Sequence, residues 1–312
     1  MLADDRLIRA RASLEGLALG DAFGDRLFFD NYTFQRDAAE EPFVDRRPPG
    51  GRWDYTDDTQ MALSVVETLA RHGRIDQEAL ALSFGARFER GRGYGPAMYD
   101  LLPQLRAGVP WQRASRGLFG GQGSFGNGGA MRIAPLGAYF ADDLPAVVEQ
   151  AALATEVTHA HPEAIAGAVA VAAAAALAWQ TRFEPTLVGA AFLERVLAWV
   201  PDSAVRERTA QVQAFAANTP IWTVVRAVGN GSGITAQDTV PFCLWCAAHH
   251  LDSYLAAIWR TADGLGDIDT NCAIVGGIVA ARVGVEGLPA DWIARRERLP
   301  AWAFGAADVG EQ

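Results

Sequence analysis

Two short acidic segments hold the residues of this chain best suited to chemistry. Tyr55-Thr56-Asp57-Asp58-Thr59 precedes an apolar run with helical spacing, and Gly266-Asp267-Ile268-Asp269-Thr270 precedes a second run of that kind. Carboxylate and hydroxyl oxygens are the ligands that Mg²⁺ and Mn²⁺ prefer. Adjacent acids also repel each other unless a cation neutralises them. The pattern predicts a divalent metal site at two helix starts. Two ordinary helix N-caps are the alternative, because Asp and Thr are favoured at that position.

A glycine-rich segment lies between the two acidic clusters. Seven of the thirteen residues from Gly117 to Gly129 are glycine, and a helical pattern follows at 130–140. Glycine lets the backbone approach a ligand closely, and such a turn before a helix can bind an anion. No G-K-[ST] ends the segment and no strand precedes it, so neither a Walker loop nor a dinucleotide-binding unit is expected. A flexible linker is the alternative, but Phe119 and Phe125 are unusual linker residues.

Helices must position these segments. Apolar spacing predicts helices at 4–19 (with Gly20 as the stop), 59–71, 76–89, 97–106, 111–116, 130–140, 144–157, 163–180, 185–199, 202–215, 239–249, 252–262 and 270–283. Strand signals are almost absent. The acidic clusters lie some 210 residues apart and meet only if the chain folds as one unit. We therefore expect one all-α domain over 1–312, a packed multi-helix array.

After Asp21-Ala22-Phe23-Gly24-Asp25, the stretch to about Tyr55 has no regular pattern. It contains several aromatic residues, which are too many for simple disorder. Irregular stretches of this length are commonly functional. We interpret it as a lid or wall over a site, with an ordinary packed surface loop as the alternative.

Bulk composition limits the partners. The chain has 312 residues, half of them hydrophobic, and a net charge of −10. This charge argues against binding a nucleic-acid backbone, so sequence-specific nucleic-acid binding is not expected. The charged N-terminus lacks a signal-peptide core, and the alanine-rich run 164–179 is too short to span a membrane. We expect a cytoplasmic protein, without a membrane partner, in which that run is a helix buried on all sides.

Cys243 and Cys246 form a C-x-x-C next to His249 and His250. A zinc or redox site is one interpretation. The surrounding segment reads as a buried apolar helix, however, and no second cysteine pair completes a structural zinc site. We favour core cysteines.

Five segments in order resemble one family. They are Gly16-Leu17-Ala18-Leu19-Gly20-Asp21-Ala22-Phe23-Gly24, Tyr55-Thr56-Asp57-Asp58-Thr59-Gln60-Met61, Gly123-Ser124-Phe125-Gly126-Asn127-Gly128-Gly129-Ala130-Met131-Arg132, Thr158-His159-Ala160-His161-Pro162 and Gly266-Asp267-Ile268-Asp269-Thr270. Together they resemble the ADP-ribosylglycohydrolases, which include dinitrogenase-reductase-activating glycohydrolases and ADP-ribosyl-acceptor hydrolases. Arg92-Gly93-Tyr94-Gly95 and the full glycine loop look nearest the serine-ADP-ribose hydrolase branch.

The resemblance implies an orthogonal all-α fold with a binuclear Mg²⁺ or Mn²⁺ centre. By carry-over, the metal ligands are Thr56, Asp57, Asp58, Asp267, Asp269 and Thr270. The implied reaction is hydrolysis of the glycosidic bond between ADP-ribose and an acceptor, which is a protein side chain or a related adduct. Asp58 or Asp269 is the expected proton relay.

The resemblance also implies a substrate site along the glycine loop. Backbone N–H groups and the Ser124 hydroxyl would hold the diphosphate, and Phe119 and Phe125 would flank the adenine. The substrate-binding residues implied are Phe119, Gly123, Ser124, Phe125, Gly126, Asn127, Gly128, Gly129 and His159. His159 is a ribose or phosphate contact on this view, with helix cap or packing residue as the alternative.

Three neighbours of this site are expected to be structural. Arg132 could contact phosphate, but a buried ion pair that fixes the loop is favoured. His161 and Glu163 are expected to support the fold.

One departure from the family pattern concerns the loop after Gly24. Many relatives carry a glutamate there, which in serine-type members is a metal ligand and a gate. Here Asp25-Arg26-Leu27-Phe28-Phe29-Asp30 contains none, and Asp25 and Asp30 are the candidates to replace it. Two other functions remain open: a catalytically silent ADP-ribose binder or structural relative, and an unrelated Mg²⁺-dependent phosphohydrolase.

Overall fold

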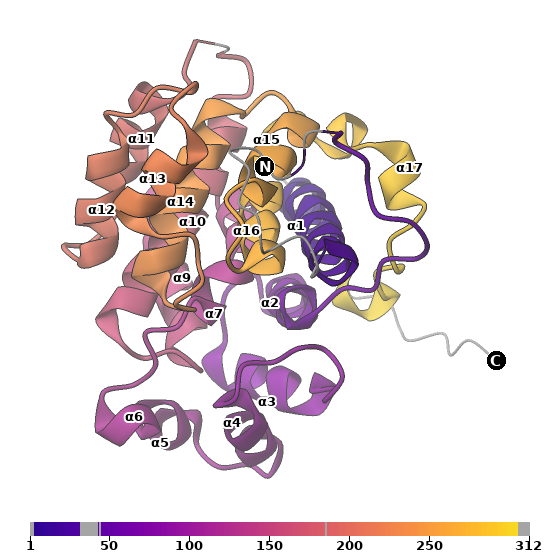
Figure 1. Cartoon of the computed structure of the whole chain (residues 1–312). Coiled ribbons are helices and arrows are strands. Elements are labelled where there is room, and N and C mark those ends of the chain that lie inside the picture. The colour runs from indigo at the N-terminus through magenta and orange to yellow at the C-terminus, as the bar shows by residue number, and fades with distance from the viewer. Residues whose placement is uncertain (1–2, 32–42, 44, 185, 305–312) are drawn as a thin grey trace.

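The computed structural model describes residues 3–31, 43, 45–184 and 186–304. Within them the chain is helical, and the only extended pairings are the isolated bridges Trp53–Arg296 and Gly126–Thr235 (Figure 1). The α-helices are α1 (Ala3–Asn31), α2 (Asp57–His72), α3 (Gln77–Arg87), α4 (Met98–Arg106), α5 (Trp111–Arg116), α6 (Leu118–Gly121), α7 (Gly128–Met131), α8 (Ala134–Tyr139), α9 (Leu144–Glu156), α10 (Pro162–Gln180), α11 (Ala190–Leu197), α12 (Ala204–Val212), α13 (Ile221–Val228), α14 (Ala236–His249), α15 (Tyr254–Ala262), α16 (Ile268–Val283) and α17 (Ala290–Ile293), with 3-10 turns at Val285–Gly287 and Ala301–Phe304. The all-α prediction is confirmed.

Helix α1 packs lengthwise against α16, and glycine makes the close approach possible. A Cβ atom at Gly20 would lie 2.1 Å from the carbonyl oxygen of Cys272, and one at Gly24 would lie 2.6 Å from the Cα of Asp269. The prediction that Gly20 ends the first helix is therefore wrong. Gly20 instead lets α16 approach α1 closely, and α1 continues to Asn31. This packing brings the middle of α1 to the first turn of α16.

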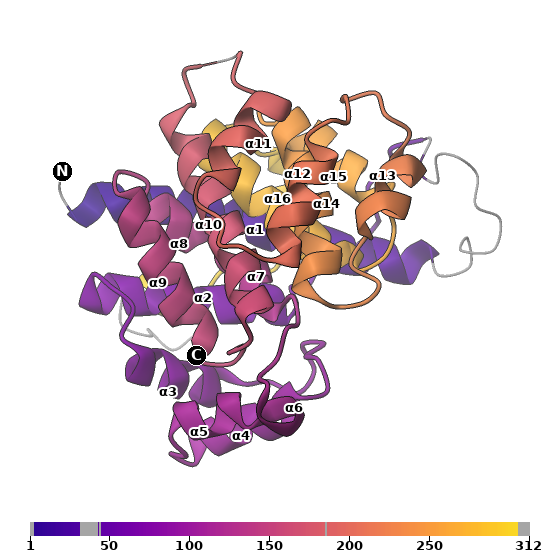
Figure 2. The same ribbon diagram turned by 90° about the vertical axis from the view of Figure 1, so that its left-hand side faces the viewer.

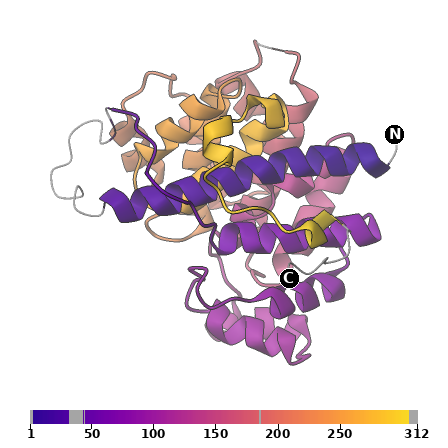
Figure 3. The same ribbon diagram turned by 90° about the vertical axis from the view of Figure 1, so that its right-hand side faces the viewer.

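Helix α2 lies beside α1, and α3 to α6 form a layer beyond it (Figures 2 and 3). On the other side of the molecule, α10 runs through the interior. The expectation that its alanine-rich run is too short to span a membrane is wrong, because α10 is long and apolar enough by length and composition alone. However, 78% of its most apolar stretch is buried against the rest of the protein. Its alanines have almost no exposed surface. The prediction of a helix buried on all sides is confirmed.

Several helix boundaries differ from the prediction. The expected helix at 130–140 is broken into α7 and α8, because Pro135, in the first turn of α8, has no N–H with which to continue the earlier helix. The helix expected at 185–199 is only α11, and α13 was not predicted. The stretch expected to be irregular after Asp25 is helical as far as Asn31. The lid interpreted beyond it falls mainly on 32–42 and 44, outside the described residues.

The three cysteines lie in the core. Cys243 and Cys246 are buried in α14, and the Cys243 thiol contacts Asn271 of α16. Burial raises the pKa of both thiols, so they stay protonated. This is the environment of core cysteines, as favoured above.

Candidate active site

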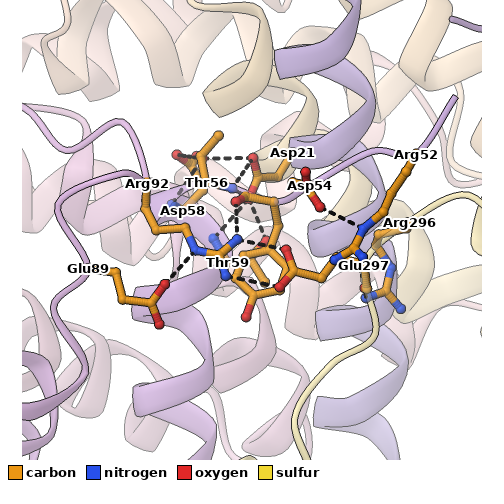
Figure 4. A network of polar contacts seen from close by, with 11 residues as sticks. Asp21, Arg52, Asp54, Thr56, Asp58, Thr59, Glu89, Arg92, Arg296 and Glu297 are labelled. Atoms are coloured by element: carbon orange, nitrogen blue, oxygen red, sulfur yellow. Dashed lines mark hydrogen bonds and ion pairs between the residues drawn. The ribbon is translucent and has the colours of Figure 1, made fainter. Parts of the chain in front are cut away.

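The first turn of α2 is organised by Asp21 of α1. The Asp21 carboxylate accepts hydrogen bonds from the backbone N–H groups of Thr56 (3.0 Å) and Thr59 (3.1 Å) and from both threonine hydroxyls, at 2.8 and 2.5 Å (Figure 4). It therefore caps the N-terminus of α2 from another helix. Sequence reasoning did not assign Asp21 a role, although it stands inside the first matching segment.

The two acidic segments meet at Asp58. Its Oδ2 atom lies 3.2 Å from the Thr56 hydroxyl and 3.5 Å from the Thr270 hydroxyl of α16. Its Oδ1 atom is buried and accepts no hydrogen bond. A buried carboxylate oxygen without a partner is costly, and a cation is one natural way to satisfy it.

Burial and mutual repulsion raise the pKa values of the clustered acids. Burial, and then the charge of Asp269, places the pKa of Asp25 at about 6 and that of Asp267 at about 8. Burial places that of Asp21 at about 7, with Asp269 again adding to it. Burial raises the pKa of Asp57 and Asp58 well above the usual range, and the charges of Asp269 and Asp21 add to it. Ionising all of these acids together would therefore concentrate more negative charge than their surroundings neutralise.

The glycine loop is fixed to this cluster by Asn127. Its side-chain amide donates to Asp267 Oδ2 (2.7 Å) and to the Thr239 hydroxyl (3.1 Å). The loop backbone also pairs with the start of α14, since Ala236 N–H donates to the Phe125 carbonyl at 3.0 Å. The Asn127 side chain, expected to contact substrate, is thus buried and directed at an acid of the other motif.

His159 supports the loop from behind. Its ring is buried, its Nδ1 atom lies 2.8 Å from the Thr158 hydroxyl, and a Cβ at Gly128 would lie 2.6 Å from its Cε1 atom. Burial lowers the pKa of His159 to about 3, with Arg132 adding to the effect, so the ring is neutral. Ser124 is also buried, and its hydroxyl accepts from the Gly126 N–H at 3.2 Å. The contacts of His159 with Thr158 and Gly128 favour a role in packing against the glycine loop.

Two aromatic rings stand at the outer edge of the loop. Phe119 is 59% exposed and Phe125 37% exposed, with ring centroids 6.4 Å apart. Phe119 has a φ of +52°, an uncommon conformation for a residue with a side chain. Exposed aromatic rings at this spacing form a surface on which a flat base can stack.

Arg132 is buried, but the ion pair expected for it is wrong. Its guanidinium donates to the Ala154 carbonyl, the Thr158 hydroxyl and the Met61 sulfur, none of them a carboxylate. Burial lowers its pKa to about 9. It joins α2, α7 and α9 beneath the loop. His161 and Glu163 are structural as expected: His161 caps α10 and Glu163 accepts from the first N–H groups of α12.

Asp25 and Asp30 are the two candidates to replace the missing glutamate, and the structure describes the side chain of Asp25. Asp25 lies half-buried on α1, where burial, and then the charge of Asp269, raises its pKa. The side chain of Asp30 lies outside the described residues.

Divalent ions of the kind that the resemblance implies need several oxygen donors around one point. Among the described residues, no three His, Cys, Asp or Glu side chains surround a single point. An ion would therefore also need hydroxyl, water or substrate oxygens, which octahedral Mg²⁺ and Mn²⁺ accept. The unpartnered Asp58 Oδ1 and the raised pKa values of its neighbours fit such an ion.

Comparison with known proteins settles the family. The model of the ADP-ribosylglycohydrolase family matches residues 2–310. The chain belongs to the ADP-ribosylglycohydrolases. As a member of this family, the protein hydrolyses a glycosidic bond of ADP-ribose. The match confirms the resemblance inferred from the motifs.

Individual ADP-ribosylglycohydrolase relatives cover nearly the whole chain. An ADP-ribosylhydrolase ARH3 from Xenopus tropicalis is 28% identical over 97% of this chain and 94% of its own length. An ADP-ribosylarginine hydrolase Tri1 from Pseudomonas putida (strain GB-1) is 29% identical over 93% of this chain and 74% of its own length. A solved structure described as an ADP-ribosylglycohydrolase-related protein complex superposes with a TM-score of 0.61 at 25% identity, covering 94% of both chains.

Proposed function

We propose that this ADP-ribosylglycohydrolase is a divalent-metal-dependent enzyme that releases ADP-ribose from a modified protein side chain. The observation that carries the proposal is the meeting of the acidic motifs of α2 and α16 at Asp58 and Thr270, beside the glycine loop. The relatives ARH3 and Tri1, named as an ADP-ribosylhydrolase and an ADP-ribosylarginine hydrolase, support the substrate class.

Two Mg²⁺ or Mn²⁺ ions are proposed to bind between α2 and α16. The ligands proposed are Thr56, Asp57, Asp58, Asp267, Asp269 and Thr270, with Asp25 as the substitute for the absent glutamate. When bound, such ions neutralise the clustered charge, orient substrate oxygens and lower the pKa of water. Asp21 would then hold the first turn of α2 in place, and Asn127 would hold Asp267.

The remaining chemistry falls to side chains of the chain itself. Hydrolysis at the anomeric carbon needs a base that takes a proton from water and an acid that returns one to the leaving group. Asp58 and Asp269 are the proposed proton relays. Both lie at helix starts, where the N–H dipoles stabilise a carboxylate after it has lost its proton.

The substrate would lie along the glycine loop. Backbone N–H groups of 123–129 are proposed to hold the diphosphate, because an acidic protein must bind such an anion through oriented amides and cations. Phe119 and Phe125 are proposed to stack against the adenine. His159 would keep the loop in shape from behind.

Release assays test the proposal. The protein is incubated with arginine-, serine- and thymidine-linked ADP-ribose in Mg²⁺ or Mn²⁺, and then in EDTA. We expect release from at least one protein-type linkage, and its loss in EDTA. Release that persists in EDTA would contradict the metal dependence. Failure on all three substrates, with ADP-ribose still raising the melting temperature, would favour a silent ADP-ribose binder.

A further inference from the structure

The loop that begins the first acidic motif is held by Arg92 from both sides. The Arg92 guanidinium donates to the Tyr55 carbonyl at 2.9 Å, and the Arg92 backbone carbonyl accepts from the Asp57 N–H at 2.7 Å. The guanidinium also lies over the Tyr55 ring, 4.1 Å from its centroid. One residue therefore fixes the chain immediately before and immediately after Thr56.

Both backbone polar groups of Thr56 itself are also hydrogen-bonded. The Thr56 N–H donates to Asp21, and its carbonyl accepts from the Gln60 N–H at 3.1 Å. The positions of the Asp57 and Asp58 carboxylates follow from the direction in which this short segment enters α2. A shift of Arg92 would be transmitted to both acids.

Arg92 is itself oriented by the C-terminal part of the chain. Glu297 accepts two hydrogen bonds from its guanidinium, at 2.7 and 3.0 Å, in the forked geometry of a strong arginine–carboxylate pair. Glu297 is anchored by its backbone. Its N–H donates to the Trp53 carbonyl, and the Trp53 N–H donates to the carbonyl of Arg295. Both side chains are largely buried, at 17% and 18% exposure. Figure 4 shows this network beside Asp21, Thr56 and Asp58.

A second carboxylate binds the same guanidinium. The Arg92 Nε atom donates to Glu89 at 3.1 Å while its two other nitrogens donate to Glu297, so both pairs exist together. The side chain of Glu89 is 62% exposed and that of Glu297 is 18% exposed. Because water screens an exposed ion pair, Glu297 is the stronger of the two partners that hold Arg92 at the Tyr55 carbonyl.

We propose that Arg92 and Glu297 are positioning residues, through which the C-terminal segment sets the Thr56-Asp57-Asp58 motif for catalysis. The inference rests on the proposed function. It predicts that breaking the pair damages the site more than the fold, because the Trp53 pairing still holds the C-terminal segment.

The test compares Arg92→Lys and Glu297→Gln with Arg52→Gln as the control. Arg52 forms an exposed ion pair with Asp54 at 2.8 Å in the same region, without touching the motif. We expect kcat to fall about 10- to 100-fold in Arg92→Lys and about 10-fold in Glu297→Gln, the range seen when residues that orient metal ligands are replaced. Mn²⁺ affinity, titrated calorimetrically without substrate, should fall about 10-fold, while Arg52→Gln should leave both unchanged.

The exchange variant Arg92→Glu/Glu297→Arg separates positioning from structure. It restores an ion pair but not the donor to the Tyr55 carbonyl, so the melting temperature should recover while kcat stays low. Recovery of both, or kcat and Mn²⁺ affinity within twofold of wild type in the single variants, would overturn the proposal. So would a loss of melting temperature with unchanged kcat per folded molecule. If wild type cleaves no substrate, the proposed function fails, yet the Mn²⁺ titration still decides the positioning role.

Discussion

Asp58 combines full burial, an oxygen without a partner and several acidic neighbours. Asp58→Asn removes an acid whose ionisation the metal-free fold disfavours, so we expect it to stabilise the protein in EDTA by about 1 kcal/mol. The same change should lower turnover in Mg²⁺ at least about 100-fold. Melting curves in EDTA and initial rates measure the two effects, with the exposed Asp54→Asn as control. A variant that loses stability in EDTA and keeps its turnover would contradict this role.

The exposed rings of Phe119 and Phe125 carry a separate prediction. If they stack on the adenine, each change to alanine should weaken ADP-ribose binding about 10-fold, since stacking on an aromatic ring is worth about 1–3 kcal/mol. Calorimetric titration with ADP-ribose and with ribose 5-phosphate checks it, because only the ligand with a base should lose affinity. Phe183, 81% exposed and distant in sequence, provides the control Phe183→Ala. Equal losses for both ligands would speak for a general loop defect.

For single residues, the sequence pointed to the acids of the two motifs but not to the residues that hold them in place. The acids of both motifs could be named from residue type and position after a loop. The roles of Asp21 and Asn127 could not, because each acts on residues 35 to 140 positions away, which only the folded chain brings near. Arg132 shows the limit of type-based reasoning, since backbone carbonyl, hydroxyl and sulfur replace the expected carboxylate.

Among the elements, the contact between α1 and α16 determines whether the site can form. Gly20→Ala would press a methyl group against the Cys272 carbonyl, so we expect a loss of about 1–3 kcal/mol in the free energy of unfolding. Urea unfolding measures it. Gly91→Ala, where an added methyl meets nothing within 4 Å, is the matched control. Equal stability of the two variants would show that the helices separate without cost.

Helix positions were largely predictable from apolar spacing, and helix ends were not. Glycine at 20 looked like a stop because sequence alone cannot distinguish a C-terminal glycine from one that admits a neighbouring helix. The eight-residue α13 carries Ile221, Val224 and Val228 at helical spacing, and all three are buried, so apolar spacing could have predicted it. Tertiary packing decided the role of Gly20.

For the whole molecule, the raised acid pKa values predict how stability depends on pH. Asp21 and Asp267, with pKa values of about 7 and 8, are protonated in the metal-free fold at low pH and ionised in the unfolded chain above about 4. Stability should therefore fall as pH rises toward 8. The contribution of His159 to the pH dependence has the opposite sign. Its lowered pKa reduces stability only below about pH 6.5, where the histidine of the unfolded chain binds a proton.

Melting temperatures between pH 6.5 and 8.5 isolate the carboxylates. In EDTA the melting temperature should fall through this window, and the increase produced by Mg²⁺ should grow with pH, since the ion binds the ionised acids. A melting temperature that is flat or rises in EDTA would contradict the charge assignment. The single domain over 1–312 and the cytoplasmic location remain predictions.

The hydrogen bond from Asn127 to Asp267 implies reciprocity between two ligands. A nucleotide that orders the glycine loop also orders Asp267, so ADP-ribose should raise Mn²⁺ affinity by the same factor by which Mn²⁺ raises ADP-ribose affinity. A factor of about 10 lies within the usual range of such coupling. Asn127→Ala should reduce it equally in both directions, as paired calorimetric titrations would show, and an unchanged factor would contradict the link. The cell's divalent cation level would then control substrate capture as well as turnover.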